Sequence, residues 1–285
     1  MHDPSNRKTM KLLGRFSHLL LLPLWLAGLY WAGASLQADR HFQRAREYVD
    51  NPARHVEELN AALKLNPWHG MAQADMGRVM TAREDWMGTI AWTRRALQDV
   101  FFLDLQRQLA NAYYQLWDKA RLSKKMIMYA ESFNRVAAEQ YSNILLFLPD
   151  DRDSLYRLAQ LDLISDPAKS IALARRSLLI YPPASDTNYL LNMALAQEME
   201  HVSNERLRTD WSVRGDYREA MHATHRAVLL GPSQNLGPEV FQRADFKDHL
   251  KQWDMWIRNV EAGELRPEAA VNLETNRGRG VRPAQ

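Results

Sequence analysis

Residues 16–36, FSHLLLLPLWLAGLYWAGASL, form an apolar run without Asp, Glu, Lys or Arg. A helix of this length spans roughly 30 Å, the thickness of the hydrocarbon core of a bilayer. Trp25, Tyr30 and Trp31 lie in the second half of the run, and aromatic residues of this kind gather at membrane interfaces. The pattern therefore predicts a single transmembrane helix, preceded by a short basic tail at residues 1–15.

A cleaved signal sequence is the alternative interpretation of the same run. Lys8, Lys11 and Arg15 would then form the basic segment, and residues 32–34, Ala-Gly-Ala, would form the cleavage site. The length of the run and its bulky aromatic residues favour an uncleaved anchor. Basic residues flank the run on both sides, with a weak excess before it. We therefore expect a bacterial inner-membrane protein whose residues 37–285 lie in the periplasm.

From residue 37 onward the apolar positions recur at helical spacing, and no long stretch alternates with a period of two. Four segments end alike, with a small or medium-sized residue five positions before a Pro and aliphatic residues in between. The Pro residues of two of these segments stand 33 residues apart, which suggests one repeated unit. The segments are residues 58–67, 138–149, 172–182 and 223–232.

These segments resemble the tetratricopeptide repeat (TPR), a helix–turn–helix unit of about 34 residues. The TPR pattern has small residues at its eighth, twentieth and twenty-seventh positions and a Pro after the second helix. Residues 70–103 match it most completely, with Gly77 and Ala96 at two of the small positions and Trp86 at an aromatic one. Small residues let two antiparallel helices approach closely, and Pro ends the second helix.

The resemblance implies an all-α, TPR-like α-solenoid of about five repeats over residues 37–238, with insertions near 118–135 and 201–214. Residues 239–262 suit a capping helix, because the last hairpin of a solenoid would otherwise expose an apolar face. Residues 263–285 are polar and lack apolar periodicity, so we expect a disordered tail.

The composition and the motifs of the chain exclude several kinds of functional site. The chain has no Cys, which excludes disulfides, thiolate metal sites and Cys nucleophiles. Its formal net charge of +3 is too small to indicate nucleic-acid binding. Motifs typical of zinc proteases, serine hydrolases and nucleotide-binding loops are missing from the sequence. We therefore expect no enzymatic activity, no cofactor and no bound metal.

The stretch RGDYREAMHATHRAVLLGP, residues 214–232, contains two further motifs. Its first three residues spell an adhesion tripeptide, and His222 and His225 lie on one face of a helix. A metal site needs further ligands, and only Glu219 stands one turn away. The resemblance places the tripeptide at a repeat's turn and the histidines on its second helix. We interpret both motifs as ordinary repeat residues.

In TPR proteins the first helices line a concave groove. Arg107 and Asn111 fall where some TPR proteins hold the C-terminal carboxylate of a peptide, and Arg can bind a carboxylate in bidentate geometry. Arg157 departs from that clamp, where an Asn is expected. We therefore expect a mixed groove for an extended or helical peptide, and Trp211, in the second insertion, as a partner contact outside it. The candidate groove residues are Arg78, Arg107, Asn111, Tyr114, Tyr156, Arg157, Gln160, Asn188 and Leu191.

The expected function is that of a non-catalytic, membrane-anchored scaffold that binds other proteins as an accessory subunit or assembly factor of an envelope complex. One alternative is a structural subunit held in a larger membrane complex through its transmembrane helix, with Gly28 and Gly33 at the helix contact. Another is a glycan- or polymer-binding protein of an export pathway. That role would use Tyr113, Tyr114 and Tyr156.

Overall fold

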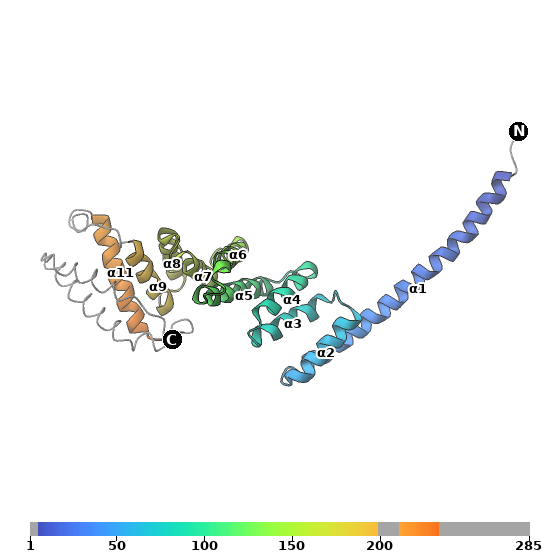
Figure 1. Ribbon diagram of the computed structural model, residues 1–285, viewed down its shortest axis with the longest axis horizontal. Coiled ribbons are helices and arrows are strands. Elements are labelled where there is room, and N and C mark those ends of the chain that lie inside the picture. The colour runs from blue at the N-terminus through green and yellow to red at the C-terminus, as the bar shows by residue number, and fades with distance from the viewer. Residues whose placement is uncertain (1–4, 199–210, 234–285) are drawn as a thin grey trace. The chain divides into compact units, whose positions relative to one another are not determined.

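The computed structural model describes residues 5–198 and 211–233, and α-helices follow one another through both ranges. Side chains are described from residue 22 onward within these ranges, apart from five residues of the last helix. The helices are α1 (Ser5–Glu47), α2 (Pro52–Leu65), α3 (Gly70–Ala82), α4 (Trp86–Asp99), α5 (Leu103–Leu122), α6 (Ile127–Phe147), α7 (Arg152–Asp162), α8 (Pro167–Ile180), α9 (Ser185–Glu198) and α11 (Trp211–Leu230) (Figure 1).

Capping residues mark the starts of several helices and a glycine marks the end of one. Asp85, Asp151 and Asp166 cap α4, α7 and α8, because their carboxylates accept a hydrogen bond from a backbone N–H of the first turn. Glu84, with φ of 56°, turns the chain between α3 and α4. Gly231, with φ of 73°, ends α11 in the left-handed conformation that glycine adopts without strain.

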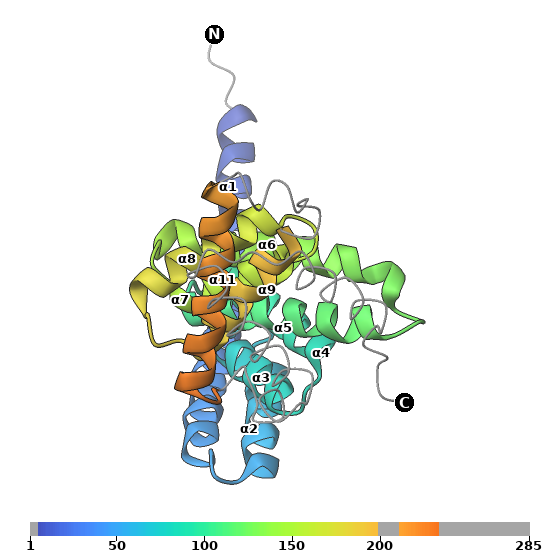
Figure 2. The same cartoon turned by 90° about the vertical axis from the view of Figure 1, so that its left-hand side faces the viewer.

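The contacts divide the chain into two units, residues 1–140 and 141–285. In the first unit α1 pairs with α2 and α3 pairs with α4, and α5 packs on α4. The turn that joins α1 to α2 and the two helices beside it are visible in Figure 2. Small and apolar side chains fill the space between α1, α2 and α3: Ala38, Phe42, Ala45, Leu59, Ala62, Leu63, Ala72 and Met76.

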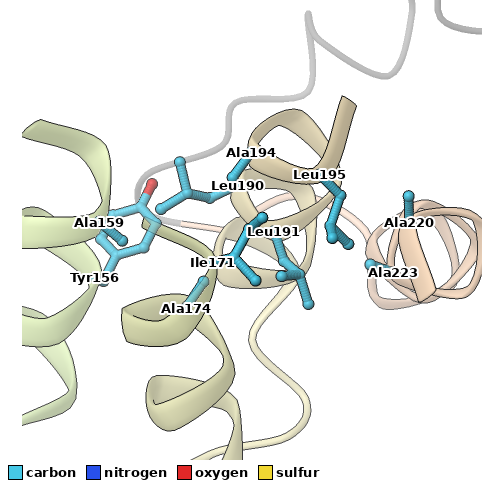
Figure 3. Close-up of a cluster of buried hydrophobic side chains, with 10 residues drawn as sticks. All are labelled: Tyr156, Ala159, Ile171, Ala174, Leu190, Leu191, Ala194, Leu195, Ala220 and Ala223. Atoms are coloured by element: carbon cyan, nitrogen blue, oxygen red, sulfur yellow. The ribbon is translucent and has the colours of Figure 1, made fainter. Parts of the chain in front are cut away.

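In the second unit α7 pairs with α8, and α9 packs between α8 and α11. Leu190, Leu191 and Leu195 of α9 form the centre of its core, with Tyr156 of α7 and Ala220 of α11 among the surrounding residues (Figure 3). Ala220 has no exposed surface, which lets α11 approach α9 closely. The hairpins of both units confirm the predicted all-α architecture.

Helix α1 differs from the predicted organisation because it is continuous. Residues 5–15 of the predicted basic tail, the predicted apolar span and the first helix of the first repeat lie within one helix, Ser5–Glu47, without a break at Pro23. No helix in the part of the chain that the structure describes is long and apolar enough to cross a membrane. The predicted span begins at residue 16, and the described side chains begin at residue 22.

The two predicted insertions have different outcomes. Around residues 118–135 the extra length is helix, because α5 runs to Leu122 and α6 starts at Ile127. The second insertion lies outside the described residues up to residue 210, and α11 starts at Trp211. Residues 214–216 therefore lie within a helix, not at the turn that we predicted. The predicted capping helix, residues 239–262, and the tail, residues 263–285, lie outside the described residues.

Candidate functional site

The candidate site is a cleft of about 600 Å³ in the first unit. It lies between the C-terminal end of α1, the first turns of α2 and the C-terminal half of α3. Its apolar lining comes from all three: Val49 follows α1, Pro52 and Val56 belong to α2, and Val79 and Ala82 belong to α3. The side chain of Val49 is 65% exposed although it is apolar. The cleft thus offers hydrophobic surface that no other part of the described chain covers.

Charged residues surround this apolar surface. Arg78 of α3 forms an ion pair with the buried Asp75 one turn earlier in the same helix. For Arg46 and Arg83, which also line the cleft, the described residues provide no ion-pair partner. Because Asp75 already faces one arginine, the cleft carries a net positive charge that an anionic ligand would complement.

His55 fixes one wall of the cleft. Its Nδ1 lies 2.7 Å from the carbonyl oxygen of Ala45, near the C-terminal end of α1. A carbonyl oxygen only accepts hydrogen bonds, so Nδ1 carries the proton and donates. The same carbonyl oxygen also accepts from the backbone N–H of Tyr48 at 3.0 Å, so the imidazole is its second donor. It holds the start of α2 against α1.

Of the predicted groove residues, Arg78 lines this cleft. Arg107 and Asn111 lie on α5, the next first helix. Arg107 is partly exposed and forms an ion pair with Asp104, and Asn111 is half-buried. Gln108 Nε2 donates a hydrogen bond to Thr81 Oγ1 across 3.0 Å, so α5 lies beside α3 as the resemblance implies.

Tyr156, Arg157 and Gln160 form a second group on α7. Gln160 Nε2 donates to the Tyr156 hydroxyl at 2.9 Å, and Arg157 Nη1 donates to Gln160 Oε1 at 3.0 Å. The Arg157 guanidinium also lies 5.6 Å from the centre of the Tyr156 ring. The structure therefore brings these three predicted residues together. The Tyr156 ring itself is only 4% exposed and belongs to the core.

The positions of Asn188 and Leu191 differ from the exposed groove positions that we expected. Both side chains are buried, and Leu191 packs in the core of the second unit (Figure 3). Asn188 Nδ2 donates to the carbonyl oxygens of Pro182 and Ala184, at 3.2 and 2.8 Å. Its amide therefore secures the chain entering α9. A ligand on the surface would not contact either residue.

The tyrosines proposed for a glycan platform are also buried. Tyr113 and Tyr114 are 8% and 7% exposed, and the Tyr114 ring contacts Trp117 with 5.3 Å between ring centres. Stacking of a sugar ring requires an open aromatic face, which neither residue presents. The side chain of Trp211, the predicted contact outside the groove, lies outside the described residues.

The tripeptide at residues 214–216 and the two histidines, His222 and His225, lie within α11. Asp216 and Glu219 form ion pairs with Arg175 of α8, so the acidic residue of the tripeptide has a partner within the chain. His222 and His225 are exposed. Within the described ranges, no three His, Asp or Glu side chains converge as a metal site would require.

Sequence reasoning missed most of the cleft. Arg46, Val49 and His55 belong to the first repeat, whose match to the TPR pattern is poor, and no groove position was assigned there. A signal was present, since Arg46 and Val49 stand three residues apart immediately before the turn at Asn51 and Pro52. Only the folded hairpin shows that both face α3.

Comparison with known proteins supports the fold. No protein-family model and no curated sequence matches the chain. The structure of YrrB, a TPR protein with an unusual peptide-binding site, is 12% identical, with a TM-score of 0.53 over 71% of this chain and 91% of that chain. PilF of Pseudomonas aeruginosa is 14% identical, with a TM-score of 0.49 over 86% of this chain and 99% of that chain. A TPR protein of Parabacteroides merdae is 13% identical, with a TM-score of 0.48 over 87% of this chain and 95% of that chain.

At these identities the likeness concerns the fold alone. The hairpins of α3 with α4 and of α7 with α8, the small residues at the helix contacts, and the superposition on YrrB agree with one another. The chain is an all-α helical repeat solenoid that resembles TPR proteins.

Proposed function

We propose that this protein is a membrane-anchored scaffold that binds a segment of a partner protein in the cleft between α1, α2 and α3. The observation that carries the proposal is the combination of open apolar walls with Arg46 and Arg83, two arginines without ion-pair partners among the described residues. The TPR-like fold supports it, since the structure of YrrB, which shares that fold, has a peptide-binding site.

The cleft indicates the chemistry of the bound segment. Val49, Val56 and Val79 suit aliphatic side chains, whose burial is favourable by about 25 cal/mol per Å². Arg46 and Arg83 suit carboxylates, which the planar guanidinium binds with two parallel hydrogen bonds. The ligand that fits is an acidic peptide segment with aliphatic residues. It is a contact for a protein partner, so the proposed role is non-catalytic.

The anchor is the second part of the proposal. Residues 16–36 hold the chain in the inner membrane of a bacterium, and residues 37–285 lie in the periplasm. Support comes from the large apolar side chains that α1 exposes, among them Leu24 at 68%, Trp25 at 70% and Tyr30 at 77%. Exposed apolar surface of this extent indicates a membrane or protein interface. An anchored scaffold of this kind would serve as an accessory subunit or assembly factor of an envelope complex.

Charge reversal tests the cleft. The full-length protein is captured from mildly solubilised membranes, the retained partner is identified, and overlapping peptides from it are assayed for binding. Arg46→Glu with Arg83→Glu is expected to weaken the best peptide at least about tenfold, because carboxylates would then face carboxylates. Lys125→Glu with Arg135→Glu is the matched control, since both residues are exposed outside the cleft. If the two double variants bind peptide equally well, the cleft is not the binding site.

A further inference from the structure

Trp68 is a large apolar side chain in an unusual position. It lies in the connection between α2 and α3, is 63% exposed, and stacks on Trp31 of α1. The two ring centres are 5.2 Å apart and the ring planes differ by 22°. Trp31 remains 45% exposed in spite of this contact. The pair thus presents two indole rings side by side on the surface of the first unit.

The pair adjoins a stretch of α1 that is apolar on every side. Successive residues of a helix point about 100° apart, so Leu24, Trp25 and Leu26 face different directions, as do Leu29, Tyr30 and Trp31. All six side chains are between 45% and 77% exposed. A protein groove would cover one face of such a helix, whereas a bilayer surrounds it. The arrangement therefore selects lipid as the covering medium.

Trp31 and Trp68 lie where this surface ends. Leu36 is the last exposed large apolar residue of the stretch, and Gln37, Asp39 and Arg40 follow it on exposed positions. An indole ring is favoured at such a boundary, because its ring is apolar and its N–H seeks a polar partner.

The connection that carries Trp68 is held against α1. The Trp68 backbone N–H donates to Asn66 Oδ1 at 3.1 Å. The next residue, His69, bonds through Nε2 to Asp39 Oδ1 of α1 at 2.9 Å, and its Nδ1 accepts from the backbone N–H of Ala72. These bonds on either side of the indole fix its place beside Trp31.

We propose that Trp68 is a second membrane contact, which rests with Trp31 in the interfacial layer of the bilayer and holds the first repeat against the membrane surface. This inference rests on the proposed anchoring through residues 16–36. It gives the first unit a defined orientation in which the connection between α2 and α3 faces lipid.

The orientation has a consequence for the cleft. Helix α2 has 14 residues and is therefore roughly 20 Å long. Trp68 follows its C-terminal end, and Pro52 and His55 of the cleft lie at its N-terminal end. Figure 2 shows the turn between α1 and α2 at the end of the hairpin remote from the N-terminus. In the proposed orientation this turn and the cleft beside it point away from the bilayer, where a partner in the aqueous phase can enter the cleft.

Depth-dependent quenching tests the proposal. The chain contains no Cys, so single cysteines can be introduced without other changes. Trp25→Cys, Trp68→Cys and Met128→Cys, each exposed, are labelled with the fluorophore NBD in the full-length protein. Pro67→Cys is a fourth site that preserves the Trp31–Trp68 stack. The proteins are reconstituted in vesicles of phosphatidylcholine and phosphatidylglycerol, with or without a lipid that carries a nitroxide just below the headgroup.

We expect the emission at residues 25, 67 and 68 to be lost when the nitroxide lipid is present, and the emission at residue 128 to be retained. Quenching at residue 25 with retained emission at both 67 and 68 would overturn the second contact and leave the anchor in place. Retained emission at all four sites would overturn the anchor, and the inference with it. Circular dichroism confirms that each labelled protein keeps its helices.

Discussion

A Cβ atom added to Gly77 would lie 2.8 Å from the hydroxyl oxygen of Thr93, closer than side-chain contacts allow. Gly77 is on α3 and Thr93 on α4, and the hydrogen atom in place of a side chain lets the two helices meet. Gln108 of α5 approaches the same point, with Nε2 at 3.1 Å. The small residue that the repeat pattern places here is therefore required by contacts with two neighbouring helices.

Gly77→Ala is expected to destabilise the first unit. The added methyl group has to displace Thr93, and overpacking of this kind costs about 1–3 kcal/mol. Alanine recovers up to about 1 kcal/mol through its higher helix propensity. The net loss should lower the melting temperature of the full-length protein in detergent, followed by circular dichroism.

Thr93→Ala provides the control for this change. The Thr93 hydroxyl is buried and has no hydrogen-bond partner among the described residues, so its removal opens space without breaking a bond to any of them. In the Thr93→Ala background, Gly77→Ala should cost less than in the wild type. Equal costs in both backgrounds would show that the 2.8 Å approach does not limit this position.

The sequence predicted the parts of the fold that rest on local rules. Small residues at helix contacts, such as Gly77 and Ala96, mark where helices pack, and Pro residues mark where the second helix of a repeat ends. These features need only a few neighbouring residues to be recognised. The continuity of α1 was not predicted, because the apolar run and the first repeat have different composition although no helix-breaking sequence separates them.

The candidate site was harder to predict, because the exposure of a side chain depends on which helices pack beside its own. Asn188 and Leu191 occupy groove positions by count from the start of the repeat, but α9 packs between α8 and α11 and both side chains are buried. Arg46 and His55 stand nine residues apart in the sequence and meet in one cleft only because α1 and α2 fold into a hairpin.

His69 should stabilise the start of α3 in two ways. Its Nδ1 accepts a hydrogen bond from the backbone N–H of Ala72, and its Nε2 bonds to Asp39 of α1. His69→Ala removes both, and loss of the cap alone costs about 0.5–2 kcal/mol. His69→Asn restores a capping side chain without the reach to Asp39, so its denaturant midpoint should fall between those of wild type and His69→Ala. Equal midpoints for the two variants would exclude a capping role.

Replacement of Asn188 by Ala or by Asp is expected to destabilise the second unit. Asn188→Ala removes the side-chain donor to the carbonyl oxygens of Pro182 and Ala184, although the Ala184 oxygen keeps its bond from the backbone N–H of residue 188. The loss of these two side-chain bonds should cost about 1–3 kcal/mol. Asn188→Asp places a carboxylate against those oxygens and should cost about 3 kcal/mol or more at neutral pH. Burial raises the pKa of the new carboxyl in the folded state, so this variant is relatively most stable at acidic pH and loses stability as the pH rises. The difference in denaturant midpoint between Asn188→Asp and the wild type should therefore be larger at pH 7.5 than at pH 4.5. An equal difference at the two pH values would contradict this account.

Arg175 joins α8 to α11 through Glu219 and Asp216. The hydrogen bond with Glu219 is the largest cause that raises the pKa of Arg175 above its ordinary value, and Asp216 adds to it. Because the folded-state pKa is raised, the arginine's contribution is fully present below its ordinary pKa and is lost only as the pH rises through the raised value, far above neutral pH. The partners are partly exposed, so Arg175→Met should cost no more than about 1 kcal/mol. The difference in melting temperature from wild type should stay constant between pH 7 and pH 10 and shrink in 1 M NaCl, since salt screens exposed charges. A difference that persists in salt would assign the effect to packing of the arginine stem.

Arg107 and Asn111 allow the extent of the binding surface to be measured. They lie on α5 beside α3, which contributes Arg78 to the cleft, so an extended peptide that leaves the cleft along the first helices would reach them. Arg107→Glu with Asn111→Ala should then weaken binding of a long partner peptide several-fold by charge repulsion. A short peptide that fills only the cleft should bind the variant as it binds the wild type. Because Arg107 is partly exposed and forms its ion pair with the exposed Asp104, circular dichroism and melting temperature should change little. Equal binding of both peptides to wild type and variant would confine recognition to the cleft, whereas equal weakening of both would place the primary site on α5.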